Sequence, residues 1–542
     1  MKNFSKLILP FLAVGLLVSS CASDFLETRS TSAVDNTEMF VSTQNAYYAL
    51  NGLHRKMYTS GSSTAPRCGW GSYMLQMDFM GEDLVYTRSN AQWGGSVKWT
   101  THRSPTNAYN SWLYGWFYDI ILNANYIIEN VDKAEGSQDE KDNIKGQALA
   151  YRAFCHFYLV QAWAKRYVKD ANNTQPGIVV KISSDMDNLP RSSVEEVYKV
   201  INQDLDDAIT LLGRTSIKRP DVTNINVYVA KALKARVLLV QGRWLEAASM
   251  AKDVIDHSGA TLQSDTYDRK VGRMCSASNK EWLWAKIGQP TIETGKLLNF
   301  FSYISNTNVS YNMNTPRAIY NLLYDKISDT DVRKSLWLPN APSMNKKDIA
   351  LPPNGNYYKW ISQKYLVCDP DNSSASYNGS LYTADMPYIR IPEMYLIAAE
   401  GYAKGGEEKE AAKILYPMAK SRDPQYTLST KRGEDLLDEI DVQRRVELWG
   451  EGFRWLDLKR QNKPLDRGPA PRAGYNQGGT ANGWGSGKTP KNLDPLASNF
   501  NMYHDKPFGE IYRYKAADDI EWEFVIPKSE LDRNPLVEQN PL

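Results

Sequence analysis

The sequence predicts a mostly α-helical fold, in which tetratricopeptide-like helix pairs form a scaffold and a loop-rich irregular region with minor β structure packs against it. Two observations lead to this fold class. Apolar residues recur at intervals of three and four over long segments of the chain, which is the pattern of amphipathic helices. Two pairs of such segments also carry small residues at the spacing of tetratricopeptide repeats, in which about 34 residues form two packed helices.

The individual helices follow from this periodicity. In the first of them, Leu113, Phe117 and Ile120 begin one apolar face. The third has a start signal as well, because Ser193 at the cap position and Glu196 three residues later form a capping box. The segments with helical periodicity are 113–131, 153–167, 194–212, 227–240, 245–255, 394–403 and 408–420.

Two pairs of these helices have the tetratricopeptide spacing. The first pair turns at Gln241-Gly242-Arg243 and the second at Gly405-Gly406. Small residues at the facing positions let the helix backbones approach closely. Generic helical hairpins would give a similar pattern, and that alternative stays open here. Looser pairs combine 106–132 with 140–167, and 194–212 with 227–240.

Residues 1–20 are predicted to form a lipoprotein signal peptide. Lys2 and Lys6 give it a positive start, and the apolar run Leu7–Val18 is too short to span a bilayer of about 30 Å as a helix. The segment Leu17-Val18-Ser19-Ser20-Cys21 resembles a bacterial lipobox, so we expect cleavage before Cys21 and lipidation of its sulfur. An ordinary signal peptide followed by a chance cysteine is the alternative.

The other cysteines lie far apart in the sequence, and their pairing cannot be chosen from it. Cys155 lies in an apolar helical pattern and is expected to be a buried thiol. The cysteines whose disulfide state stays open are Cys68, Cys155, Cys275 and Cys368.

Charge balance and motif content argue against several functions. Lys plus Arg number 64 and Asp plus Glu 62, and removal of Lys2 and Lys6 with the leader would bring the balance to zero, which argues against nucleic-acid binding. The five His residues form no H-E-x-x-H motif, so no metal site is predicted. Gly485-Ser486-Gly487-Lys488-Thr489 imitates a phosphate-binding loop, but Asn482 stands where its first Gly is required.

No cofactor is predicted. A structural calcium site built from Asp and carbonyl oxygens stays open but unsupported, because the chain has no EF-hand spacing. A hydrolytic pair of carboxylates cannot be excluded by counting, since Asp and Glu are plentiful.

Five segments of the chain carry a resemblance to one known family. They are Cys21–Glu27, Ala148–Ala164, Arg390–Glu400, Gln443–Leu458 and Phe524–Pro541. Together they resemble the SusD/RagB lipoproteins of Bacteroidetes, and Gln443–Leu458 is the most specific match. The resemblance extends over nearly all of the mature chain. It implies an N-terminal SusD-like helical region over 21–260 and a C-terminal region over 261–542 that contains loop insertions and the final repeat.

The charged residues of the most specific segment are interpreted as structural. Glu447, Glu451, Arg454 and Asp457 lie at helical spacings, so we expect charge-assisted hydrogen bonds that hold the C-terminal part to the repeats. Gly452 is expected to allow a close approach of two backbones. None of these residues is expected to act as a catalytic acid.

The resemblance implies a binding protein that is not an enzyme. Members of the family are surface-exposed lipoproteins of the outer membrane, and they hold a nutrient over a TonB-dependent transporter. We therefore expect this protein to capture an oligosaccharide or polysaccharide ligand and to deliver it to a SusC-like partner transporter. A peptide or another nutrient, as in RagB-like importers, is the alternative ligand, and a surface glycoside hydrolase is a less favoured alternative. The sequence does not identify the glycan or the transporter.

Glycan-binding members of the family use aromatic side chains from the loop after the first helices and from a middle insertion. A sugar ring has an apolar C–H face that stacks on Trp or Tyr, and hydroxyls that bond to Asn or Arg. In this chain the irregular, aromatic-rich regions are 59–104 and 260–388, and a third at 461–510 is rich in Gly, Pro and Asn. The candidate ligand-binding residues are Trp70, Tyr86, Arg88, Asn90, Trp93, Trp99, Tyr303, Tyr311 and Trp337.

Overall fold

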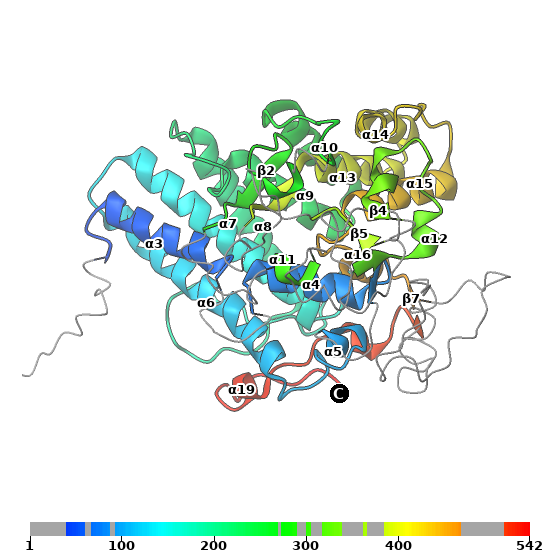
Figure 1. Ribbon diagram of the computed structural model, residues 1–542. Helices are drawn as coiled ribbons and strands as arrows, with labels where there is room; N and C mark the ends of the chain where they lie inside the picture. The colour runs from blue at the N-terminus through cyan, green and yellow to red at the C-terminus, as the bar shows by residue number, and fades with distance from the viewer. Residues whose placement is uncertain are drawn as a thin grey trace, which may run out of the picture.

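Long helices dominate the computed structural model of the chain (Figure 1). The structure describes residues 39–59, 67–86, 93–268, 273–289, 300–304, 317–338, 361–365, 384–467 and 514–542. The leader with Cys21, the candidates Arg88, Asn90 and Tyr311, and the residues Cys368 and Gly485–Thr489 lie outside these ranges.

The predicted mostly α-helical fold is confirmed. The long helices are α3 (Thr43–Lys56), α4 (Trp70–Met80), α6 (Ala108–Asn130), α7 (Gln138–Trp163), α8 (Val194–Arg214), α9 (Val227–Val240), α10 (Trp244–His257), α13 (Ile391–Lys404), α14 (Glu408–Arg422) and α15 (Gly433–Glu447). Shorter helical segments are α5 (Gly94–Val97), η1 (Val131–Lys133), η2 (Arg273–Cys275), α11 (Phe301–Ile304), α12 (Asn321–Tyr324), η4 (Val332–Leu336), α16 (Arg454–Arg460), η6 (Ile520–Trp522) and α19 (Lys528–Leu531).

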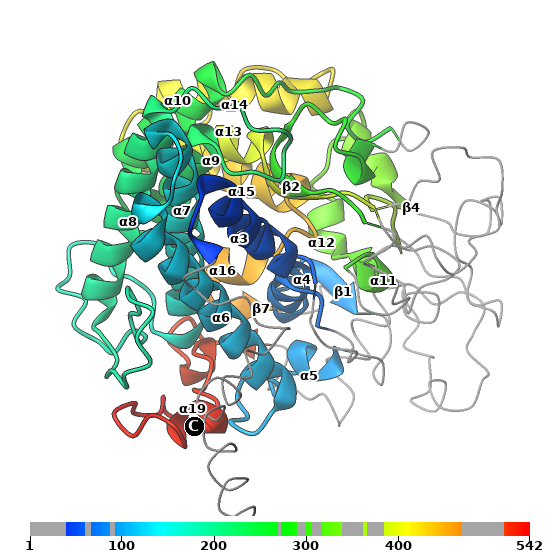
Figure 2. The ribbon, with the colours of Figure 1, turned by 90° about the vertical axis from the view of Figure 1, so that its left-hand side faces the viewer.

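The helix pairs expected from the sequence pack against each other. From α6 to α10 each long helix contacts the next one, and α13 contacts α14. The two series are joined where α10 packs on α13, although much of the middle region lies between them in the sequence. Figure 2 shows α6 to α10, α13 and α14 along one side of the molecule, with β1, α11 and β4 on the other.

The contact between α10 and α13 depends on a residue without a side chain. A Cβ at Gly401 would lie 2.5 Å from the carbonyl oxygen of Trp244 and 3.0 Å from the Cβ of Ala248. Only glycine lets the two backbones come this close, which agrees with the role expected for small residues in the repeats.

Capping boxes begin two of the scaffold helices. As predicted, Ser193 Oγ accepts from the N–H of Glu196, and the Glu196 carboxylate accepts from the N–H of Ser193 at 2.8 Å. Ser137 and Glu140 form the same pair at the start of α7, which the sequence analysis missed. Each box satisfies two N–H groups that a helix start would otherwise leave without acceptors.

Helix α4 corrects the expectation that residues 59–104 are irregular. Every residue from Trp70 to Met80 is buried, including Gln76 and Asp78. A helix that is buried on all sides has no amphipathic period, so the search for periodicity could not find it. Burial also confirms the expectation for Cys155, which is a fully buried free thiol on α7.

Short strands form the minor β structure. In the described part of the chain, one sheet has the order β1-β3-β5-β4, and two further pairs are β2 with β6 and β7 with β8. All pairings are antiparallel. The strands are β1 (Leu84–Tyr86), β2 (Trp282–Lys286), β3 (Arg317–Ile319), β4 (Trp337–Leu338), β5 (Ile361–Ser362), β6 (Met386–Arg390), β7 (Leu465–Asp466) and β8 (Tyr514–Lys515).

The charged residues at helical spacings in 443–458 belong to two helices and the turn between them. Helix α15 ends at Glu447, and α16 begins at Arg454. Gly450 and Gly452 lie between them with φ of +79° and +83°. A Cβ at Gly452 would lie 2.7 Å from the Cα of Met74, so the expected close approach is confirmed.

The charge-assisted bonds expected from these residues are confirmed, with partners from distant parts of the chain. Glu447 is fully buried and accepts from Arg333, Arg390 and Arg422 at 3.0–3.1 Å. Although burial opposes ionisation, the three guanidinium groups hold the pKa of Glu447 well below its usual value. Further pairs in this region are Glu451 with Arg390 and Lys364, Arg454 with Glu82, and Asp457 with Arg444 and Arg460.

Candidate ligand-binding site

The four-stranded sheet brings together the two regions that carry the predicted ligand-binding residues. Strand β1 comes from the first region, and β3, β4 and β5 come from the middle region. In the register of β1 and β3, Tyr86 lies opposite Arg317. Tyr86, which precedes Arg88 and Asn90 in the sequence, and Arg317, which follows Tyr311, are therefore paired in the sheet.

Trp93 and Tyr303, predicted from different regions, are in contact. Their ring centroids lie 5.7 Å apart in an edge-to-face arrangement, and Trp93 also stacks on Phe79 at 5.3 Å. The guanidinium of Arg317 lies 4.7 Å from the centre of the Phe79 ring, and its Nε donates to the carbonyl oxygen of Tyr303. The start of β3 is thus part of the same cluster.

The backbone around α5 is strained at both ends. Trp93 precedes the helix with φ of +75°, and Trp99 follows it with φ of +59°. A left-handed conformation costs a residue with a Cβ about 1–2 kcal/mol. Such strain persists only where the surroundings enforce it, and it concentrates at binding and catalytic sites.

Contacts with α4 and β7 enforce this conformation. Trp99 Nε1 donates to the carbonyl oxygen of Met80 at 2.9 Å, and Ser96 Oγ donates to Gln76 Oε1 at 2.5 Å. The buried guanidinium of Arg467, which follows β7, donates to the carbonyl oxygens of Phe79, Gly81 and Val97. The short helix is therefore fixed to the helical core on one side.

The indole nitrogen of Trp93 is buried without an acceptor. Trp93 is 7% exposed, and among the described residues none accepts a hydrogen bond from its Nε1. A buried donor left without a partner costs about 1–3 kcal/mol, so such groups are rare in native structures. This donor lies at the centre of the cluster that joins the two predicted regions.

Three further predicted residues, Trp70, Trp99 and Trp337, lie in the interior. Trp70 packs against Tyr73, Phe154 and Tyr158, and Trp99 against Trp455 and Trp522. Trp337 on β4 packs against Trp449. Tyr86 belongs to β1 through its backbone. A role of these residues in ligand binding remains a prediction.

Sequence reasoning missed a row of rings on α6, formed by Tyr109, Trp112 and Trp116. Trp93 lies 5.4 Å from Tyr109, Tyr109 lies 5.7 Å from Trp112, and Trp112 lies 6.3 Å from Trp116, all between ring centroids. We call Tyr109, Trp112 and Trp116 the α6 ring row. The sequence does contain a sign of this row, because its three residues are spaced by three and then four positions, as on one side of a helix. They lie beside the apolar face that begins at Leu113.

Trp112 is, with Tyr109, one of the two partly exposed members of this row. It is half-buried, whereas Trp116 is buried and donates from Nε1 to the carbonyl oxygen of Lys56 at 3.0 Å. Tyr109 donates its hydroxyl to the carbonyl oxygen of Ser72 at 2.9 Å, and burial raises the pKa of Tyr109 well above its usual value. The row therefore presents a rigid aromatic surface whose polar groups are mostly satisfied by the protein.

The chemistry of this region is that of stacking and hydrogen bonding. Within the described ranges, no cluster of three or more His, Cys, Asp or Glu side chains is arranged to hold a metal ion. The helices in those ranges include none that is both long and apolar enough to cross a membrane.

Two family models together match nearly the whole chain beyond its first 23 residues. The model of the SusD family matches residues 243–542. A second model, described as starch-binding associating with outer membrane, matches residues 24–239. The SusD model alone covers more than half of the chain.

Individual relatives agree with this. The chain is 22% identical over 503 residues to SusD-like protein P38 of Formosa agariphila, an alignment that covers 86% of this chain and 92% of that protein. A SusD-like carbohydrate binding protein of Bacteroides vulgatus has a TM-score of 0.73 at 23% identity, covering 92% of this chain and 98% of that one.

Surface glycan-binding protein A of Bacteroides thetaiotaomicron, solved in complex with laminarihexaose, has a TM-score of 0.64 at 17% identity. That likeness covers 92% of this chain and 99% of the other. The helical scaffold, the short sheet and these sequence matches lead to one conclusion: the chain belongs to the SusD family.

Proposed function

We propose that this protein binds an oligosaccharide at the cell surface and delivers it to a SusC-like TonB-dependent transporter in the outer membrane. The observation that carries the proposal is the α6 ring row, which contacts Trp93 and, through Trp93, Tyr303 of the second predicted ligand region. A half-exposed Trp beside further rings offers the flat apolar face on which a sugar ring stacks. Membership of the SusD family supports the same ligand class.

Two relatives support carbohydrate as the ligand. One similar structure is that of a SusD-like carbohydrate binding protein, and another holds laminarihexaose. We extend this ligand class to the present chain because the α6 ring row, with the partly exposed Trp112, offers a stacking surface for a sugar ring. In this proposal the protein binds its ligand without converting it.

The membrane location is proposed from the sequence. Cys21 follows a lipobox-like segment, and a diacylated cysteine would anchor the chain stably, since two acyl chains bind where one does not. The family description of association with the outer membrane supports this location. Mass spectrometry of the native protein from the membrane fraction tests it: the expected N-terminus is a lipidated Cys21, and an unmodified or uncleaved one contradicts it.

A glycan array on residues 22–542 tests ligand binding. We expect one class of polysaccharide or oligosaccharide to bind and to quench Trp fluorescence. Trp112→Ala should weaken binding by up to about tenfold, because an aromatic stacking contact contributes about 0.5–1.5 kcal/mol. Trp244→Ala on α10, which removes another half-buried Trp away from the row, should leave the affinity unchanged.

The outcomes separate the alternatives. Equal loss of affinity in both Trp variants would contradict a role for the row. A silent array together with heat released on titration with mixed peptides would replace the carbohydrate proposal by peptide binding. We expect an oligosaccharide to keep its length after prolonged incubation with the pure protein. Shortened products would contradict the proposal that the protein binds its ligand without cleaving it.

A further inference from the structure

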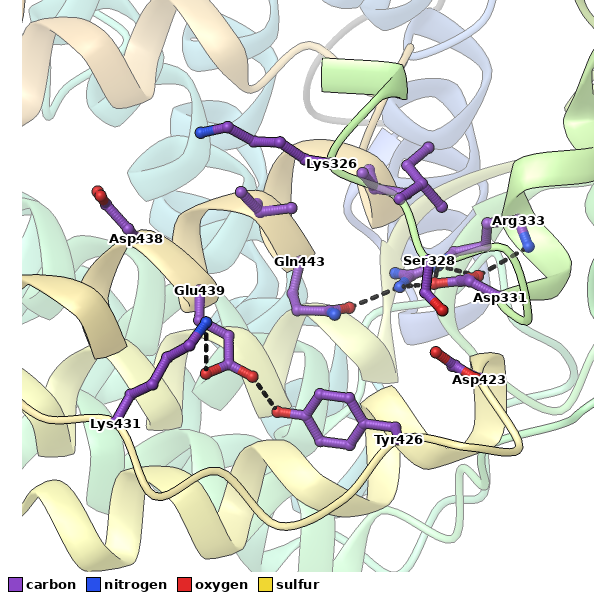
Figure 3. Close-up of a pocket in the computed structure, with 13 residues that line it drawn as sticks. Lys326, Ser328, Asp331, Arg333, Asp423, Tyr426, Lys431, Asp438, Glu439 and Gln443 are labelled. Atoms are coloured by element: carbon purple, nitrogen blue, oxygen red, sulfur yellow. Dashed lines mark hydrogen bonds and ion pairs between the residues drawn. The ribbon is translucent and has the colours of Figure 1, made fainter. Parts of the chain in front are cut away.

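A separate cavity of about 390 Å³ lies beside α15 (Figure 3). Its walls come from α15, from the segment 326–333 between β3 and β4, and from the segment 423–431 that joins α14 to α15. It shares no residue with the α6 ring row or with the predicted ligand-binding residues. The volume is at the small end of the range of about 300–1,000 Å³ that ligand pockets occupy.

The back of the cavity is rigid. Arg333 is 1% exposed, and its guanidinium donates to Asp331 at 2.6 Å, to Gln443 Oε1 at 2.6 Å and to Glu447 at 3.1 Å. Two carboxylates therefore balance this cation, so it offers no uncompensated positive charge to a ligand. The bond from Arg333 also fixes the orientation of the Gln443 amide.

The side of the cavity is equally fixed. Tyr426 donates its hydroxyl to Glu439 at 2.7 Å, and Ser429 donates to the other carboxylate oxygen at 2.6 Å. Lys431 Nζ lies 3.5 Å from the same carboxylate. Figure 3 shows Tyr426, Lys431 and Glu439 meeting on one side, opposite Ser328 and Asp331.

Donors and acceptors remain available around an apolar strip. With its Oε1 held by Arg333, Gln443 has its amide N–H groups left to donate, and Lys326 and Asp438 are exposed and lack a protein partner in the described ranges. Ile327, Val442 and Val446 supply the apolar part of the lining. Mixed donors and acceptors next to an apolar strip match a pyranose, whose hydroxyls surround C–H faces.

The charge of the lining selects against anions. Apart from the compensated Arg333 and Asp331, the lining holds Asp423, Asp438 and Glu439 against Lys326 and Lys431, which leaves an excess of one negative charge. Asp423 is fixed in its carboxylate form by bonds from Thr330 and from the N–H of Gln425. A neutral ligand fits this field better than a uronate or a sulfated sugar.

We propose that this cavity is a second carbohydrate site that binds one neutral monosaccharide unit. The choice of ligand class rests on the proposed function, whereas the location and the preference for a neutral sugar follow from the cavity itself. A molecule of about a dozen heavy atoms is expected to bind with a Kd on the order of 1 mM.

Saturation-transfer NMR tests the proposal on the same chain, residues 22–542. The probes are the methyl glycosides of glucose, galactose, mannose and xylose, with methyl glucuronide as the charged counterpart. At least one neutral glycoside should give a signal that Trp112→Ala leaves unchanged. Gln443→Ala should weaken its binding at least tenfold, and Val442→Trp, which places an indole in the cavity, should abolish it.

The exposed Asp438 provides a variant that leaves the fold intact. Methyl glucuronide should not bind the natural protein, and Asp438→Lys, which reverses one negative charge of the lining, should admit it. Thermal unfolding of each variant shows whether a lost signal reflects loss of the fold.

Three results would overturn the proposal: no signal from any neutral glycoside, a signal lost in Trp112→Ala but kept in the cavity variants, or equal binding of glucuronide and neutral sugar by the natural protein. The glycan array separates the two proposals. If the array shows oligosaccharide binding but no methyl glycoside gives an NMR signal, the second site is contradicted and the proposed function is still supported.

Discussion

Glu447 shows how a single buried carboxylate joins distant parts of this chain. It accepts from Arg333 in the middle region, from Arg390 at the end of β6 and from Arg422 at the end of α14. All four side chains are buried, and charge-assisted bonds in such surroundings are strong only while every partner is present. The residue is therefore structural, although its low pKa and its many cationic neighbours resemble those of a catalytic group.

Removal of that carboxylate should destabilise the protein strongly. In Glu447→Gln the three guanidinium groups lose their shared negative charge, which for a buried pair costs about 3–5 kcal/mol. Urea unfolding followed by circular dichroism measures the loss. Glu434→Gln, an exposed position in the first turn of the same helix, should change the free energy of unfolding by no more than about 0.5 kcal/mol. Similar values for the two variants would contradict the structural role.

At the scale of elements, helices were predictable where one face is apolar and the other polar. The scaffold helices α8, α9 and α14 begin within one residue of the periodic segments expected at 194–212, 227–240 and 408–420. Helix α4 could not be found in this way because all of it is buried. The helical spacing of the charged residues 447–457 does not correspond to one helix, because two glycines with positive φ turn the chain between α15 and α16, and spacing alone cannot show that.

The turn between α15 and α16 gives a prediction of its own. Gly452→Ala adds a left-handed backbone cost of about 1–2 kcal/mol and an overpacking cost of about 1–3 kcal/mol against Met74. Gly406→Ala is the matched control, because Gly406 has φ of +88° but no atom within 4 Å of a Cβ built there. Chemical denaturation should therefore show a larger loss for Gly452→Ala, and equal losses would mean that the contact with Met74 is unimportant.

The candidate site was predictable only in part at this scale. Composition pointed to two regions whose role in ligand binding stays a prediction, and the sheet that joins β1 to β3 brings those two regions together. Which rings an aromatic residue packs against depends on segments far away in the sequence. The sequence therefore could not show that Trp70, Trp99 and Trp337 pack against other rings in the interior. Trp112 was missed because its neighbours Leu113 and Phe117 define the stronger apolar face.

Over the whole molecule, buried histidines couple stability to pH. Burial lowers the pKa of His102 and of His156 to about 3 each, whereas a histidine in the unfolded chain titrates near pH 6.5. On acidification, His102 and His156 are therefore protonated in the unfolded chain at a higher pH than in the folded protein. The stability that each neutral imidazole contributes is complete above about pH 6.5 and is lost as the pH falls, by about 1.4 kcal/mol per pH unit and residue.

Other buried groups also change stability with pH. Burial raises the pKa of Asp78, for example, so Asp78 favours the folded state as the pH falls. The contribution of His156 is therefore measured by comparison with a variant that lacks this imidazole. Between pH 7.5 and 5.5 the natural protein should lose about 1.4 kcal/mol more unfolding free energy than His156→Gln. Urea titrations at the two pH values measure the difference. An identical change in both proteins would show that His156 does not titrate as its burial requires.

The sheet β1-β3-β5-β4 separates what must stay constant in this molecule from what can vary. Its strands are two or three residues long, and β1 is secured to the scaffold where Arg445 pairs with Asp83 and Trp449 Nε1 donates to the Asp83 carbonyl oxygen. The free energy of closing a loop between fixed ends rises by only about 0.6 kcal/mol for each doubling of its length. The segments between these strands can therefore differ in length at small cost in stability, while the helical scaffold stays the same.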